Sequence, residues 1–141
     1  MNERKSMAPI RWGVILTMLS LAGVVVFFEL GVRTQWSTAL MISEIVLLVI
    51  LLITYILSFM RTGLWNFSHK PLKELDEREM EMTSKSLRIA YALFTIFVLF
   101  LLLVFAVLNI AVSIVLAVSL ILFAHLLPGT VIAFSEKALH F

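Results

Sequence analysis

Residues 87–134 read LRIAYALFTIFVLFLLLVFAVLNIAVSIVLAVSLILFAHLLPGTVIAF, an almost unbroken apolar run. Arg88 at its start and His125 are the only side chains in it that carry a charge or titrate near neutral pH. A helix needs about 20 apolar residues to cross a bilayer, so the run is twice as long as one crossing requires. It must therefore fold back on itself, which predicts two antiparallel membrane spans.

Asn109 is the only strongly polar side chain near the middle of this run. Asparagine tolerates the left-handed backbone conformation that often closes a helix. We therefore expect a tight turn near Asn109, between a third span over residues 87–108 and a fourth over residues 111–134.

Two further apolar runs precede the charged segment 61–86 and predict a first span over residues 12–30 and a second over residues 38–60. The whole chain of 141 residues is 62% hydrophobic and 14% charged. Soluble domains are roughly 45–50% apolar and about 25% charged. The composition therefore indicates one all-α domain, a four-helix transmembrane bundle with up-down-up-down order.

The positively charged residues predict the orientation of this bundle. With four spans, Arg33 alone falls on one side of the membrane, and all other Lys and Arg residues fall on the opposite side: Arg4, Lys5, Arg11, Arg61, Lys70, Lys73, Arg78, Lys85, Arg88 and Lys137. Short loops rich in Lys and Arg stay in the cytoplasm. We therefore expect cytoplasmic N- and C-termini in a prokaryotic plasma membrane, and we attribute the net charge of +2 to lipid contact rather than to nucleic acid.

The charged segment 61–86 contains a helix-start signal. Asp76 is placed to act as an N-cap, and Glu79 three residues later completes the pattern of a capping box. A helix starting here would run through the rest of the segment into the third span. Its entry is either a solvated helix start or a contact surface for a partner protein, and the expected contacts are Asp76, Arg78, Glu79, Glu81 and Lys85.

Two stretches carry a resemblance to a known group of proteins. They are Lys73-Glu-Leu-Asp-Glu-Arg-Glu before the third span and Leu126-Leu-Pro-Gly-Thr-Val-Ile-Ala-Phe at the end of the fourth. Together they resemble small prokaryotic membrane proteins of unknown function that have four spans and a Leu-Asp-Glu-Arg stretch after the second. The resemblance implies the four-span architecture and supplies no activity.

Ionisable side chains inside a membrane are costly and need an explanation. Glu29 precedes Arg33 by four residues near the outer boundary, which predicts an ion pair along one helix face. Glu44 lies eight residues after Trp36, about 12 Å into the second span, and shares a helix face with Tyr55. Glu44, with Glu29 and Arg33, is our candidate proton or cation site.

His125 in the fourth span is expected to bridge helices by a hydrogen bond, for example to Thr17 or Tyr55. Haem ligation would need a second axial ligand, and no other histidine lies within a predicted span. The chain has no cysteine and shows no phosphate loop, metal-ligand spacing or nucleophile–base set. We therefore expect no catalytic activity, no cofactor and no metal site.

Two functions remain open from the sequence. The first is a non-catalytic accessory or interaction subunit, whose partner besides the lipid bilayer is another membrane or cytoplasmic protein, or a second copy of the chain. The alternative is a small proton- or cation-coupled transporter that uses Glu44.

Overall fold

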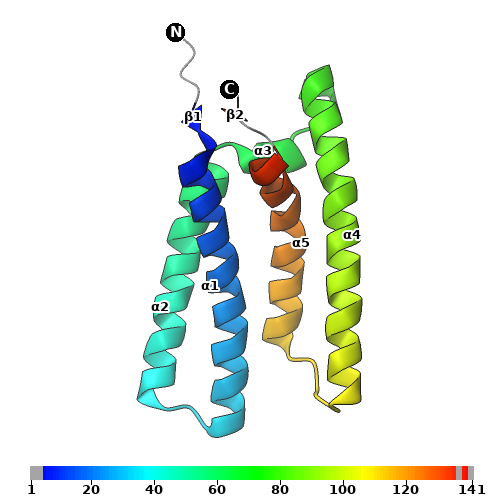
Figure 1. Ribbon diagram of the computed structural model, residues 1–141. Helices are drawn as coiled ribbons and strands as arrows, with labels where there is room; N and C mark the ends of the chain where they lie inside the picture. Colours follow the sequence, from blue (N-terminus) through cyan, green and yellow to red (C-terminus); the bar gives the residue numbers. More distant parts are fainter. Residues whose placement is uncertain (1–4, 136–137, 140–141) are drawn as a thin grey trace.

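The computed structural model describes residues 5–135 and 138–139, and four helices in this part are long and apolar enough to cross a membrane, as predicted (Figure 1). Their bounds are α1 Met7–Thr34, α2 Thr38–Tyr55 with its π-helical continuation η1 Ile56–Met60, α4 Glu77–Val107, and α5 Ile114–Ser135. The shorter elements are β1 Lys5–Ser6, α3 Leu64–His69, the 3₁₀ turn η2 Leu72–Glu74, and β2 Ala138–Leu139. The all-α class is confirmed, and the two short strands form one antiparallel pair near the chain ends.

The helix starts follow local rules. Pro9 is accommodated in the first turn of α1, where its missing N–H has no helical partner in any case. α5 begins at Ile114, slightly later than predicted, because the Ser113 hydroxyl accepts a hydrogen bond from the Leu116 amide at 3.1 Å and so acts as its cap.

The capping box at the start of α4 is confirmed. Asp76 has an extended backbone, and its Oδ1 accepts a hydrogen bond from the Glu77 amide at 2.7 Å. Glu79 Oε2 in turn accepts one from the Asp76 amide at 3.2 Å. Both ends of the motif are present, so the helix start is stabilised by the residues that the sequence indicates.

Both hairpin turns use a left-handed residue. Asn109 has φ 52° and follows Leu108, the C-cap of α4, as the sequence predicts, and Gln35 has φ 62° between α1 and α2. Residues other than glycine, asparagine and aspartate rarely adopt this backbone conformation. Gln35 was not predicted to do so, because glutamine has no such preference.

The four long helices lie in a row rather than around one central axis. Figure 1 shows them in the order α2, α1, α5, α4, and α1 packs on α2 and α5 while α5 also packs on α4. We compared how much of the most apolar stretch of each helix is buried. The buried share is 28% in α1 and 33% in α5, but only 6% in α4 and 6% in α2 with η1. The outer helices therefore present most of their apolar side chains to the surroundings, as lipid contact requires.

The core lies at the end of the row where α3 joins α5 and η1. Phe59 of η1 and Leu64 of α3 are fully buried against Leu126 and Ile132 of α5. Gly129 of α5 permits this contact, because a Cβ there would come within 3.1 Å of the Phe59 ring.

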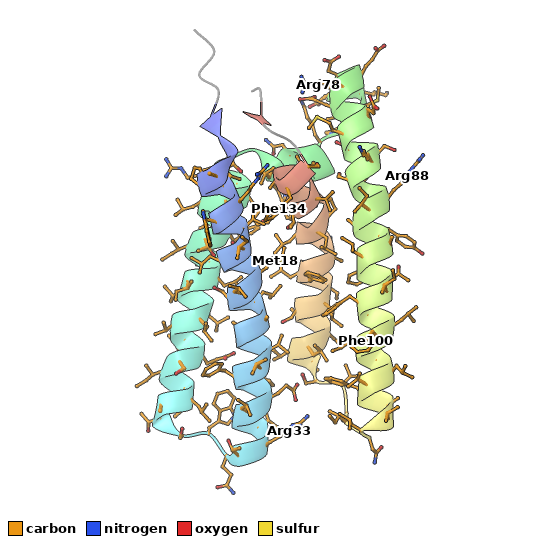
Figure 2. The ribbon with its side chains drawn as sticks, viewed as in Figure 1. Met18, Arg33, Arg78, Arg88, Phe100 and Phe134 are labelled. Atoms are coloured by element: carbon orange, nitrogen blue, oxygen red, sulfur yellow. The ribbon has the colours of Figure 1, made fainter. Side chains whose placement is uncertain are left out.

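Nearly all described cationic residues gather at this same end, which we call the basic end. Figure 2 shows Arg78 and Arg88 toward it and Arg33 at the opposite end of the molecule. The first turns of α1 and α4 and the last turns of α2 and α5 all lie here (Figure 1). Arg4 and Lys137, which the sequence also assigned to this side, lie outside the described residues.

Candidate functional site

The predicted ion pair between Glu29 and Arg33 is present. Glu29 Oε2 lies 3.9 Å from Arg33 Nη2, one helical turn apart on α1. Glu29 is the more enclosed partner, with 19% of its side chain exposed against 52% for Arg33. Its other oxygen, Oε1, is buried without a hydrogen-bond partner among the described residues.

Glu44 on α2 lies at a similar depth to Glu29. The helix register shows this, because Gly23 of α1 faces Leu47 of α2 and Gly31 faces Trp36. The two helices are antiparallel, so Glu44, three residues before Leu47, is level with the residue three positions after Gly23. Glu29 lies about one helical turn farther along α1. Its Oε2 is also buried without a hydrogen-bond partner among the described residues. Both acidic groups of the candidate proton or cation site therefore lie in the same part of the α1–α2 pair.

Tyr55 belongs to an aromatic cluster at the basic end. Its ring stacks on Phe59 with centroids 5.9 Å apart, and it meets the Trp65 ring edge-on at 5.8 Å. Trp65 of α3 stacks closely on His69, with centroids 3.8 Å apart and planes 9° from parallel. The cluster thus connects the end of α2 to α3.

His125 continues this cluster on α5. Its ring lies 5.9 Å from that of His69, centroid to centroid, with planes 12° from parallel. Its Nδ1 donates to the Ile121 carbonyl oxygen in its own helix at 2.8 Å. This differs from the expected bridge to another helix. The hydroxyls of candidate partners such as Thr17 are also bonded within their own helix, here to Gly13 at 2.8 Å.

The residues predicted for partner contact divide into two groups. Asp76 and Glu79 form the capping box, and Glu79 Oε2 also lies 3.9 Å from Lys70 Nζ. The other three line a cavity of about 240 Å³ between α4 and α5, whose walls are Arg78, Glu81, Met82, Lys85, Ser86, Ile89, Val131 and Ser135.

Sequence reasoning missed the contribution of α3 to these sites. Trp65 and His69 lie in the charged segment 61–86, and no partner within the protein was expected for them. A six-residue helix is too short to show a periodic pattern, and Gly63 before it and Pro71 after it indicate only turns. A signal was present only in the spacing of the two side chains, because Trp65 and His69 lie one helical turn apart.

The chain was compared with protein-family models, with curated proteins and with solved structures, and no match was found in any of the three. The functional argument therefore depends on the chain's own residues.

Proposed function

We propose that this chain is a non-catalytic membrane subunit that binds a protein partner through the start of α4. The observation that carries the proposal is the position of this helix. α4 takes an outer place in the row and extends beyond the other long helices at the basic end (Figure 1). Of its 31 residues only Thr83, Ser86 and Ala90 are buried, which leaves the rest of its surface accessible.

The cavity between α4 and α5 supports a protein as the partner. Its walls combine charges of both signs, from Arg78, Glu81 and Lys85, with apolar side chains such as Met82 and Ile89. Apolar contacts with charged groups around them are typical of protein interfaces, where charge complementarity selects the partner. A nucleic-acid surface would instead be dominated by positive charge.

The same proposal places the basic end in the cytoplasm of a prokaryotic cell. The positive-inside rule supports this orientation, since Arg33 is the one Lys or Arg residue assigned to the opposite end. The Leu75-Asp76-Glu77-Arg78 stretch, which carries the resemblance to four-span prokaryotic proteins, then forms the cytoplasmic entry of α4.

Site-specific cross-linking tests the interaction. A photoreactive amino acid at Lys85 should capture one defined protein in intact cells, and Glu81→Lys should abolish that capture by reversing a charge in the cavity wall. Glu81 is a better choice than Glu79, because reversing Glu79 would also break the capping box. Glu74→Lys is the matched control, since Glu74 is exposed and does not line the cavity.

Two results would overturn the interaction proposal. One is a cross-linked product that persists in Glu81→Lys at the level of the control. The other is the absence of any specific product from probes at Lys85 and Ile89, which both line the cavity.

Proton or cation handling at Glu44 is the second candidate function. It is favoured by the buried oxygens of Glu44 and Glu29, which have no hydrogen-bond partner among the described residues and lie in the same part of the α1–α2 pair. Intramembrane carboxyl groups commonly mark ion or proton pathways. Under this candidate, flux into proteoliposomes is lost in Glu44→Gln and kept in Glu74→Gln. Equal flux in both variants, or none in the unmodified protein across proton and sodium gradients, excludes it.

A further inference from the structure

An apolar groove is lined by α1, α4 and α5, in the part of these helices that is apolar enough to cross a membrane. Its volume is about 230 Å³, and every side chain that lines it is apolar except Ser119. α5 contributes Leu116, Ser119, Leu120 and Phe123, which recur at the spacing of one helix face. The groove shares no lining residue with the cavity beside the start of α4.

On α1, the face that lines the groove continues into the Glu29–Arg33 ion pair. Val25 and Val26 line the groove, and Glu29 follows them by about one helical turn, roughly 5 Å along the axis. Arg33 lies one further turn along α1, at the end of the molecule opposite the basic end (Figure 2). Residues three or four positions apart share one helix face. This face of α1 therefore changes from apolar to charged at that end of the groove.

The ion pair leaves both of its members able to bind a further group. Arg33 Nη2 and Glu29 Oε2 are 3.9 Å apart, which is longer than the roughly 2.7–3.2 Å of a hydrogen bond. Glu29 Oε1 is buried and has no hydrogen-bond partner among the described residues. Arg33 is exposed, and a guanidinium group has several N–H donors. Glu29 thus needs a donor, and Arg33 offers donors to an acidic group.

A phosphoethanolamine headgroup has the chemistry that both residues require. Its ammonium group, like that of lysine, donates hydrogen bonds and suits the carboxylate of Glu29. Its phosphate suits Arg33, because guanidinium groups bind phosphate through two parallel hydrogen bonds. A choline headgroup has no N–H donor and would leave Glu29 Oε1 without a partner. A glycerol headgroup has hydroxyl donors but no positive charge, so its hydrogen bond to Glu29 would be weaker.

We propose that this face of the protein binds one phospholipid with a phosphoethanolamine headgroup. Glu29 binds the ammonium, Arg33 binds the phosphate, and the groove holds part of one acyl chain. A water molecule fills about 30 Å³ and a methylene group is of similar size, so the groove has room for roughly eight methylene groups. Van der Waals packing favours a chain held in this way within a membrane. The inference requires neither the protein partner at the start of α4 nor ion flux through Glu44.

Native mass spectrometry of the delipidated full-length protein tests the site. Phosphatidylethanolamine, phosphatidylcholine and phosphatidylglycerol with identical acyl chains are added in turn. We expect one phosphatidylethanolamine per chain, bound at least about tenfold more tightly than either of the other two lipids. Glu29→Gln should remove this preference, because it removes the charge that selects the ammonium. Arg33→Gln should weaken the binding of all three lipids, because each contains a phosphate.

Three control variants separate the site from general contact with lipid. Glu44→Gln changes the acidic group of α2 and should leave the preference for phosphatidylethanolamine unchanged. Ala22→Phe fills the groove and should weaken binding by at least about tenfold. Ala92→Phe adds the same bulk at an exposed position of α4 that does not line the groove, and it should bind like the unmodified protein. Circular dichroism checks that all variants keep their helix content.

Several results would overturn the proposal. One is equal binding of the three lipids by the unmodified protein, which would indicate general lipid contact only. Another is a preference for phosphatidylethanolamine that survives in Glu29→Gln or disappears in Glu44→Gln. The third is an equal effect of the two phenylalanine variants, which would show that the groove holds no acyl chain.

Discussion

Arg11 near the start of α1 donates a hydrogen bond from its Nε to the carbonyl oxygen of Ala133 near the end of α5, over 2.9 Å. The two residues are 122 positions apart, and their contact joins the first and last long helices at the basic end. The Arg11 guanidinium also lies 5.9 Å from the centre of the Phe134 ring. One cationic side chain thus fastens the two central helices of the row.

Replacing Arg11 should loosen this contact. Arg11→Met keeps an unbranched apolar stem and removes the donor, and we expect it to lower the free energy of unfolding in detergent by about 1.5 kcal/mol. Arg61→Met is the control, because it removes an exposed charge at the same end and should cost less than about 0.5 kcal/mol. Chemical unfolding followed by tryptophan fluorescence measures both. Equal stability of the two variants would contradict the structural role of Arg11.

The contact between α1 and η1 should be sensitive at Gly13. A Cβ at this position would overlap the Ser58 hydroxyl, so Gly13→Ala should destabilise the protein by about 1–3 kcal/mol. Ser58→Ala removes the overlapping oxygen and should recover part of that loss in the double variant. A double-mutant cycle of thermal unfolding in detergent checks this coupling. Strictly additive effects would show that the two residues do not touch.

The turn between α4 and α5 should depend on the left-handed backbone of Asn109. Asn109→Ala should lower the free energy of unfolding by about 1 kcal/mol, because alanine resists a φ of 52°. Asn109→Gly should be neutral or slightly stabilising, since glycine adopts this conformation without strain. The same unfolding assay compares them. A glycine variant that is less stable than the alanine variant would count against this turn geometry.

The closeness of His69 and His125 can be tested by chemical linking. The chain has no cysteine, so His69→Cys combined with His125→Cys introduces a single reactive pair. A short bifunctional thiol reagent should link the two within one chain. Arg33→Cys with His125→Cys is the control pair and should give no such product, because Arg33 lies at the opposite end of the molecule (Figure 2). Mass spectrometry of the digested protein identifies the link, and its absence from the first pair would refute the contact.

Local sequence rules predicted much of this fold. The places of the four long helices followed from the apolar runs, although α1 is longer at both ends than the predicted span 12–30. The start of α4 followed from Asp76 and Glu79, and its end from Asn109. Each of these features depends on residues within a few positions of one another. The Glu29–Arg33 pair was predictable for the same reason, because its partners lie one helical turn apart.

Long-range contacts could not be predicted in this way. The order of the helices in the row depends on which surfaces pack, and nearly every surface of these helices is apolar. The approach of His69 to His125 depends on α3 turning back toward α5, which requires Gly63 with its φ of 75° and the burial of Leu64. No periodic pattern in the sequence indicates the order of the helices or the approach of His69 to His125.

Cysteine accessibility tests most directly whether four helices cross the membrane with the basic end inside the cell. Arg33→Cys introduces one thiol in the last turn of α1, and Lys73→Cys introduces one in η2, just before the start of α4 at the basic end. A membrane-impermeant maleimide applied to intact cells should label Arg33→Cys and should reach Lys73→Cys only after the membrane is opened. Labelling of Lys73→Cys from outside intact cells would contradict the orientation, and labelling of both positions from the same side would contradict the four spans.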